Sequence, residues 1–297
     1  MKNKFSLIGV PIDCIGIADK PGGTERSPAV LRECGLVKAL RADDCGDLPV
    51  RIERGVRDPA SGIVGFHSVC LTTATIRQAV REKLVAGKRP FLVGGCCTEV
   101  MGAVAGARDH FGRIGLAYLD GHLDLYTGIT SPTGEAADMP IAALLGYGPE
   151  GLFGPRKIVL PEDLALLGYR DLEDARAHNS LLPDDIPGPT YYDAERIRRR
   201  KVADGLGRKL ALDLEIGPMK RYWVHLDFDI LDPRIFPATD YRMPGGLTWP
   251  ELVKLARPIC CSSAMVGMSI ACYNPEKDPD RKCAQAIVAA LTQIFAG

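Results

Sequence analysis

The chain has 297 residues, of which 46% are hydrophobic and 25% charged, and this balance is typical of a globular protein with a sizeable buried core. Its formal net charge is zero, and its one short basic run, residues 196–201, is expected to be a solvated helix face, so binding to nucleic acid is not expected. No stretch approaches 18 uninterrupted apolar residues, so no membrane span is expected either.

Short apolar runs alternate with amphipathic stretches along the chain. The apolar runs predict strands, in chain order, at residues 4–13, 90–95, 114–120, 164–171, 221–230 and 265–275. The stretches between and after them predict helices at residues 27–40, 69–89, 98–111, 138–148, 247–260 and 280–297. The first of these helices has Ser27 as its cap and Pro28 at its first helical position.

The predicted strands are continuous apolar runs and do not alternate between apolar and polar residues. Such runs are typical of strands that are buried on both faces of a parallel sheet. We therefore expect an α/β fold with three layers, α-β-α, around a parallel open sheet. No repeat or clear linker divides the sequence, so one domain over residues 1–297 is expected.

Ten cysteines are present without a CxxC motif. The N-terminus has no long apolar region followed by a cleavage site, so we read it as a first strand and not as a signal peptide. In a chain of this length, cysteines of this kind are expected to be reduced thiols of a cytoplasmic protein.

Polar side chains gather where three of the predicted strands end. They are Cys96 and Cys97 after residues 90–95, Asp120, His122 and Asp124 around the end of residues 114–120, and Asp227 and Asp229 within residues 221–230. Ligands of parallel sheets bind at the carboxyl ends of the strands. Carboxylates crowded there without a cation would cost several kcal/mol per buried ion. Alone, each motif is also common in solvated turns. Together they favour a metal site, and their oxygen-rich ligands suit Mn²⁺, Mg²⁺ or Fe²⁺.

Several segments resemble the ureohydrolase superfamily, which comprises arginase, agmatinase and their relatives. "VGGCCTE" (93–99) stands where the family has Gly-Gly-Asp-His-Ser, and "LDGHLDLYTGITSPTGEAADMP" (119–140) where it has Asp-Ala-His-x-Asp and a loop ending in Gly-Asn-x-His-Gly. "LDFDILDPRIFPATDYRMPGGLT" (226–248) is similar to its Asp-x-Asp segment. The opening residues 9–36 resemble the family's opening and the segment 44–50 resembles its next strand, so the resemblance runs nearly end to end. It implies an arginase-like fold and a homo-oligomer, either a trimer or a hexamer.

The resemblance also implies a site for one or two Mn²⁺ ions. One ion would be held by Cys97, Asp120, Asp124 and Asp227, and the other by Asp120, His122, Asp227 and Asp229. Asp120 and Asp227 would bridge the ions, and Asp124 and Asp227 are the carboxylates to which we assign a catalytic role. In the family, hydroxide between the metals attacks a guanidinium carbon.

Three positions depart from the family pattern. Cys97 replaces a metal-binding histidine, and a thiolate is a softer ligand. Ala137 stands where the family has a histidine for proton transfer, and Asp138 could substitute only if the loop is rearranged. Cys272 aligns with a glutamate that grips the guanidinium, while the nearby Glu276 is expected to lie past the end of the strand.

Other positions bear on the substrate. The resemblance places Tyr126 and Thr133 against the amino-acid end of a substrate and Glu173 near its amino group, so these residues and Cys272 are candidate substrate contacts. Arg176 is either a contact for a substrate carboxylate or a surface charge. His225 should share a strand face with Asp227 and come near the site, as a packed strand residue or as the base of a Cys–His pair.

The expected function is hydrolysis of a C–N bond in a small guanidino or amidino molecule by metal-bound hydroxide. Because Cys272 offers no carboxylate, an N-hydroxyguanidine, which is less basic than arginine, is one candidate substrate. The alternative is a catalytically silent homologue that serves as a binding or assembly protein. The three departures favour that alternative, and the five retained metal ligands count against it.

Overall fold

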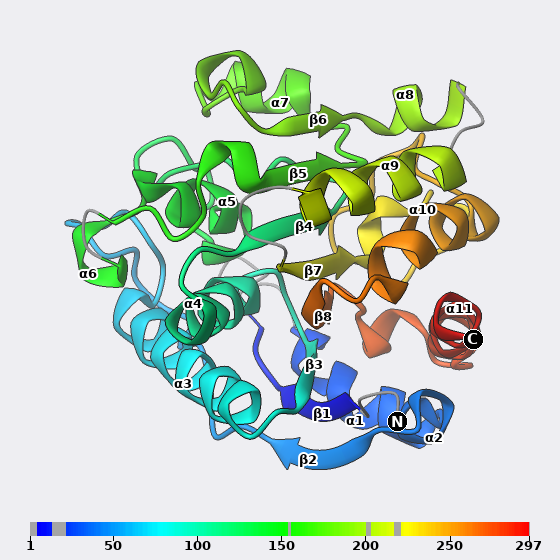
Figure 1. The fold of residues 1–297 in the computed structure, drawn as a ribbon. Coiled ribbons are helices and arrows are strands. Elements are labelled where there is room, and N and C mark those ends of the chain that lie inside the picture. Colours follow the sequence, from blue (N-terminus) through cyan, green and yellow to red (C-terminus); the bar gives the residue numbers. More distant parts are fainter. Residues whose placement is uncertain (1–4, 14–21, 154–155, 200–202, 217–220, 297) are drawn as a thin grey trace.

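A computed structural model describes residues 5–13, 22–153, 156–199, 203–216 and 221–296. Eight strands, all parallel, form one open sheet in the order β2-β1-β3-β8-β7-β4-β5-β6 (Figure 1). The strands are β1 Phe5–Val10, β2 Asp43–Asp47, β3 Arg89–Gly94, β4 Gly115–Leu119, β5 Leu164–Leu167, β6 Thr190–Tyr192, β7 Tyr222–Asp227 and β8 Met265–Ala271. The predicted parallel open sheet is thereby confirmed.

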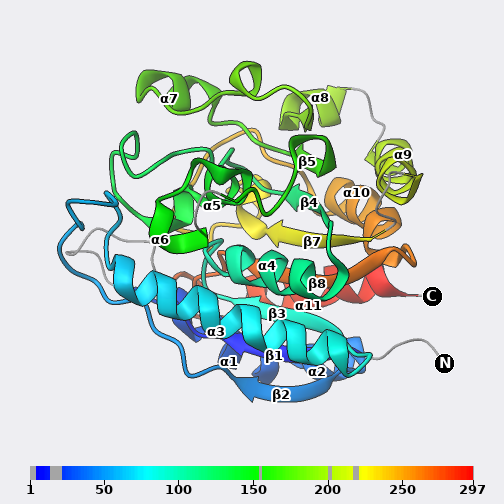
Figure 2. The same cartoon turned by 60° about the vertical axis from the view of Figure 1, so that its left-hand side comes forward.

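Helices cover both faces of the sheet and complete three layers. One face packs against α3 Phe66–Val85 and α4 Glu99–Phe111, which lie side by side (Figures 1 and 2). The other face packs against α1 Ser27–Glu33, α2 Leu36–Leu40, α8 Ala194–Arg199, α9 Ala203–Ile216, α10 Trp249–Cys261 and α11 Lys282–Phe295. The shorter helices α5 Pro140–Ala142, α6 Glu150–Phe153 and α7 Leu172–Ala177 belong to the connections after β4 and β5. Two apolar cores result, one on each face, as the continuous apolar strands require.

The six strands predicted from apolar runs are present, but the strands are shorter than those runs. The run 221–230, for example, contains β7 up to Asp227 and then a 3₁₀ turn, Phe228–Ile230. The edge strands β2 and β6 carry no apolar run, because an edge strand of few residues that is half-buried or exposed lacks this signal. The helix predicted at 138–148 is broken into α5 and a turn in which Gly146 has a φ of 91°.

Parts of three predictions lie outside the described residues. These parts are residue 4 of the first strand, residue 297 of the last helix, and residues 200–201 of the basic run; residues 14–21 of the segment that resembles the family also lie outside. Within the described ranges, no helix is both long and apolar enough to cross a bilayer.

The described cysteines include eight free thiols, in agreement with the expectation of reduced cysteines. Cys96 is disulfide-bonded, so that expectation is wrong at this position.

The strand order places four strand ends next to one another. The neighbours β3, β8, β7 and β4 come from residues that are far apart in the sequence. Because all strands are parallel, the residues that follow each of them emerge at the same edge of the sheet. This edge carries the candidate site.

Candidate metal centre

The segment after β4 holds Asp120 and His122 in a fixed turn. Asp120 Oδ1 accepts a hydrogen bond from the His122 backbone N–H at 2.7 Å, and the Leu123 N–H donates to both carboxylate oxygens of Asp171 at 3.0 Å. His122 Nδ1 lies 2.9 Å from Asp229 Oδ2 and 3.6 Å from Asp120 Oδ1. Ligand atoms of these three side chains all lie within 4.8 Å of one another, which is the spacing that one cation requires.

Asp124 lines the same cavity and has an unusual backbone conformation. Its φ is 51°, in the left-handed region, where aspartate is tolerated better than most residues. Its carbonyl oxygen accepts hydrogen bonds from the backbone N–H groups of Ile141 and Ala142 at 3.1 and 3.2 Å. The Tyr118 hydroxyl donates to Asp124 Oδ2. These contacts hold a buried carboxylate in position.

The end of β7 is tied to the end of β4 by hydrogen bonds to carboxylates. Asp227 Oδ1 accepts from the Asp229 N–H at 2.6 Å, and Asp229 Oδ1 accepts from the Gly121 N–H at 3.0 Å. Arg170 donates to the backbone carbonyl oxygen of Asp229 at 2.7 Å, and this contact stabilises the turn after β7. The two Asp motifs found in the sequence therefore lie side by side.

Two thiols complete this edge. Cys97, after β3, donates from Sγ to Asp227 Oδ2 at 2.7 Å, and its sulfur lies 3.4 Å from Asp120 Oδ2. Cys272, after β8, lies 3.7 Å from Cys97, sulfur to sulfur. Its φ is 62°, and its N–H donates to the Gly95 carbonyl oxygen at 3.2 Å. The three segments recognised in the sequence and the strand end that carries Cys272 thus meet at one place.

His225 comes near the site from within β7, as its strand face predicts. A ring nitrogen lies within 4.8 Å of ligand atoms of Cys97 and Asp120. The ring stacks on Tyr118 with centroids 4.8 Å apart, and its Nδ1 lies 2.7 Å from Ser269 Oγ. His225 is therefore a packed strand residue that also borders the cluster.

Burial and mutual repulsion govern the charges of the cluster. Burial and then the charge of Asp229 raise the pKa of Asp120 to about 6. Burial, followed by neighbouring carboxylates, also raises the pKa of Asp124 and of Asp227 well above the usual range. Burial is the largest single effect on His122 and opposes its charge, but the carboxylates of Asp229, Asp120 and Asp171 together outweigh burial and raise the pKa of His122. Burial and repulsion both disfavour the charged carboxylates, and a bound divalent ion would offset both effects.

The cluster opens into a cavity of about 390 Å³. The residues that line it include eight carboxylates and a single arginine, Arg242. The acids are Asp120, Asp124, Glu135, Asp138, Asp171, Asp174, Asp227 and Asp229. This excess of negative charge fits positively charged ligands, whether metal ions or an organic cation.

Three of the four predicted substrate contacts line this cavity. They are Tyr126, whose hydroxyl donates to Asp174 at 2.7 Å, Thr133 and Cys272. The structure does not bring Glu173 into the lining. Glu173 is exposed on α7, while Asp171 and Asp174 line the cavity, because consecutive residues near a helix point in different directions.

The remaining charged candidates lie elsewhere. Arg176 is exposed and does not line the cavity. Glu276 is paired with Arg26, past the end of β8, as expected.

Asp138 lies in the cavity wall beside Ala137. Its Oδ2 accepts hydrogen bonds from Ser131 Oγ at 2.7 Å and from Thr133 Oγ1 at 3.1 Å. Its Oδ1 is buried and has no hydrogen-bond partner among the described residues. Burial raises the pKa of Asp138 to about 7, against the lowering effect of these hydroxyl groups. The loop thus places the carboxyl group of Asp138 at the cavity, which the sequence alone could not decide.

The acids that were not singled out from the sequence include Asp171, Asp174, Glu135 and Glu99. Glu135 lines the cavity and accepts a hydrogen bond from the Tyr241 hydroxyl at 2.7 Å. Glu99, two residues after Cys97, is fully buried, and both of its carboxylate oxygens lack hydrogen-bond partners among the described residues. Burial and then Asp227 raise its pKa well above the usual range. The only feature of the sequence that could have pointed to Glu99 is an acidic residue at the start of an otherwise apolar helix.

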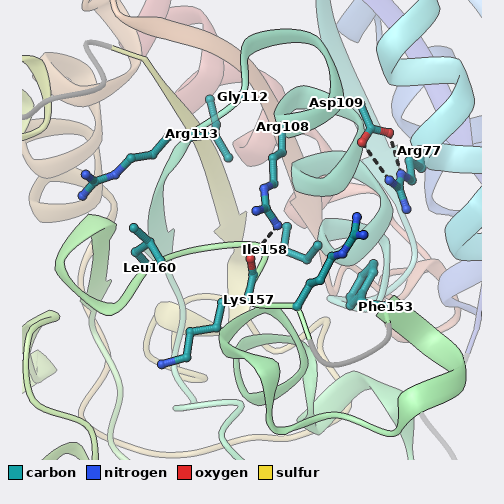
Figure 3. Close-up of a pocket in the computed structure, with 11 residues that line it drawn as sticks. Arg77, Arg108, Asp109, Gly112, Arg113, Phe153, Lys157, Ile158 and Leu160 are labelled. Carbon is teal, nitrogen blue, oxygen red and sulfur yellow. Dashed lines mark hydrogen bonds and ion pairs between the residues drawn. The ribbon is translucent and has the colours of Figure 1, made fainter.

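A second hollow, of about 460 Å³, lies near the residues that precede β4 (Figure 3). Five of its eleven lining residues are basic, and several of these already have partners. Arg77 donates two hydrogen bonds to Asp109 at 2.6 and 2.7 Å, and Arg108 donates to the Lys157 carbonyl oxygen. Its basic side chains are not metal ligands, so the candidate centre is the acidic cavity.

Comparison with known proteins identifies the family of this fold and site. A model of the arginase family matches residues 3–296. The chain belongs to the arginase family. The arginase of Brevibacillus brevis is 30% identical over 310 residues, which cover 99% of this chain and 98% of that protein. The arginase of Bacillus caldovelox is 26% identical over 304 residues, with 98% and 97% covered. A crystal structure of the latter superposes with a TM-score of 0.85 at 25% identity and 99% coverage of both chains.

The arginase-family assignment confirms the resemblance inferred from the motifs. It agrees with the arginase-like fold and with the meeting of the three motif segments at one sheet edge. Cys97, Ala137 and Cys272, where the sequence departs from the family pattern, all line this cavity.

Proposed function

We propose that this chain is a metal-dependent hydrolase that cleaves a C–N bond in a small guanidino or amidino compound. The observation that carries the proposal is the buried group of Asp120, His122 and Asp229, whose ligand atoms lie within 4.8 Å of one another in an acidic cavity. The membership of the arginase family supports the same reaction class.

The donor atoms of this group fit Mn²⁺, since two carboxylates and an imidazole are ligands that this ion accepts. Asp124 and Asp227 are the further carboxylates proposed to serve the reaction. One or two ions would bind here, and the bound metal would supply the Lewis acidity that activates the attacking water.

The charge of the cavity selects a cationic substrate head. The eight carboxylates of its lining attract a guanidinium or amidinium group, even though Cys272 cannot provide the bidentate grip of a carboxylate. A less basic head group, such as an N-hydroxyguanidine, depends less on that grip. Arg242 lines the cavity and is exposed, so it can bind a carboxylate at the distal end of the substrate.

Asp138 is proposed to move the proton in this reaction. Attack of water on the guanidinium carbon releases one proton, and the departing nitrogen must gain one before the C–N bond breaks. A carboxyl with a pKa of about 7 can accept and donate at neutral pH, and its Oδ1 has no partner that competes for the proton. The products would be an amine and urea or a urea analogue.

The direct test is an assay of the Mn²⁺-loaded protein with arginine, agmatine and N-hydroxyarginine, with urea-type product as the readout. We expect product from at least one of the three and none with Asp229→Asn, which removes a proposed metal ligand. Silence on all three substrates from a protein that does bind Mn²⁺ would contradict the proposal and favour a silent homologue with a binding or assembly role.

The oligomeric state, which the family resemblance implies, and the compartment, which the cysteines suggest, are also proposals. We propose a homo-oligomer, either a trimer or a hexamer, in the cytoplasm. Light scattering coupled to gel filtration tests the oligomeric state.

A further inference from the structure

The two thiols of the cavity lie together and share a carboxylate. Cys97, Cys272 and Asp227 follow or end the neighbouring strands β3, β8 and β7. Their ligand atoms lie within 4.8 Å of one another, with 3.7 Å between the sulfurs and 2.7 Å from Cys97 Sγ to Asp227 Oδ2. All three side chains are buried, with 5% exposure or less, and all three line the cavity.

This group differs in chemistry from its neighbour. Asp120, His122 and Asp229 offer oxygen and nitrogen, which suit Mn²⁺. The second group offers two thiolate sulfurs, which are soft ligands, beside one carboxylate oxygen, and this set favours Zn²⁺ or Co²⁺ over Mn²⁺. One cavity thus contains a group of hard ligands and a group rich in soft ligands. Because the soft group suits Mn²⁺ poorly, the two groups together do not fit a pair of identical Mn²⁺ ions.

We propose that Cys97, Cys272 and Asp227 form a thiolate subsite that binds a soft divalent ion such as Zn²⁺, next to a Mn²⁺ subsite at Asp120, His122 and Asp229. The inference rests on the proposed function for the identity of the neighbouring ion. It makes Cys272 a metal ligand, in place of a substrate contact.

We include His225, which lies near Cys97, as the candidate for the fourth ligand that zinc prefers. Its Nδ1 is engaged with Ser269 Oγ, and Ser269 Oγ also accepts a hydrogen bond from Trp223 Nε1 at 2.9 Å. Nε2 is buried and has no hydrogen-bond partner among the described residues, and a ring nitrogen lies within 4.8 Å of a ligand atom of Cys97. A serine oxygen has two lone pairs and can accept from both rings, and the Nε2 lone pair is then available to an ion.

Cobalt titration of the metal-free, reduced protein tests the subsite, because thiolate–Co²⁺ bonds give intense near-ultraviolet absorption. The wild type should show this absorption, and Cys97→Ser and Cys272→Ser should each retain about half of its intensity. Cys45→Ser, which removes an exposed thiol outside the cavity, is the matched control and should retain all of it. No absorption in the wild type, or full absorption in both cavity variants, would overturn the subsite.

A measurement on the wild type alone avoids variants that fail to fold. Zinc X-ray absorption of protein loaded with one equivalent of Zn²⁺ should show scattering from sulfur at about 2.3 Å, whereas a shell of nitrogen and oxygen alone at about 2.0–2.1 Å contradicts the proposal. The two proposals fail separately. If the Mn²⁺-loaded protein hydrolyses a substrate but the metal shows no bond to sulfur, only the thiolate subsite is contradicted. If the metal binds sulfur but the Mn²⁺-loaded protein hydrolyses nothing, only the proposed activity is contradicted.

Discussion

At the scale of single residues, we propose that the carboxyl group of Asp138 moves the proton that the family resemblance assigns to a histidine at the position of Ala137. We predict that Asp138→Asn lowers kcat by about 10²–10⁴-fold with little change in KM, because an amide cannot take up or release the proton. The amide oxygen can still accept from Ser131 and Thr133, so the loop should keep its shape. Steady-state kinetics on the most active substrate provide the measurement, and a variant with unchanged kcat would exclude Asp138 from the reaction.

The same residue gives a prediction for stability. The pKa of Asp138 is raised from 3.8 to about 7, so the folded chain keeps a proton that the unfolded chain releases. The contribution of this group to the free energy of unfolding is full below about pH 4 and is lost as pH rises to about 7. Glu135 adds to the rise in pKa, while Ser131, Thr133 and His122 oppose it.

Urea unfolding of metal-free wild type and Asp138→Asn at about pH 4.5 and about pH 7.5 measures this contribution. The free energy of unfolding should fall more with pH in the wild type than in the variant, because the other titrating groups are common to both. Equal pH dependence in the two proteins would show that Asp138 titrates normally.

At the scale of the elements, strands β7 and β8 position the site through close packing. A Cβ atom added at Gly267 would lie 2.2 Å from Cζ3 of Trp223. The indole N–H of Trp223 donates to Ser269 Oγ, which also lies within hydrogen-bond distance of His225 Nδ1. We predict that Gly267→Ala lowers the free energy of unfolding by about 1–3 kcal/mol, as overpacked cores do.

Gly205 in α9 is the matched control for this substitution, because an added Cβ there meets nothing within 4 Å. Gly205→Ala should stabilise the protein by about 0.5–1 kcal/mol, since alanine favours the helix. Chemical denaturation of both variants checks the pair. A Gly267→Ala protein as stable as Gly205→Ala would contradict the packing of Trp223.

For the whole molecule, the site couples metal binding to stability. The buried carboxylates repel one another in the metal-free state, so an ion that binds only the folded chain should stabilise it by roughly 2.7 kcal/mol at 100 times its dissociation constant. We predict that Mn²⁺ raises the thermal midpoint of the wild type and leaves that of Asp229→Asn almost unchanged. Differential scanning calorimetry gives both values, and an equal rise in the two proteins would place the binding elsewhere.

How much of this molecule the sequence could predict depends on the type of signal. The inner strands and the motifs at Asp120 and Asp227 were predictable, because buried parallel strands are continuous apolar runs and their ends share one edge. The edge strands β2 and β6 bury too little to leave an apolar run, so β2 was expected only from the resemblance of residues 44–50 to the family, and β6 was not predicted. The position of Asp138 depends on hydrogen bonds to its neighbours in the sequence. The direction of Glu173 depends on exactly where a short helix begins. Neither leaves a periodic pattern of apolar residues that could be recognised in the sequence.

The central claim is that the clustered acids hold a divalent cation. Elemental analysis of protein equilibrated with Mn²⁺ and then desalted tests it most directly, in the wild type and in an Asp120→Asn, Asp229→Asn double variant. We predict about one ion or more per wild-type chain and less than about a tenth of that in the double variant. A wild type without bound metal, or equal metal in the two proteins, would contradict the claim.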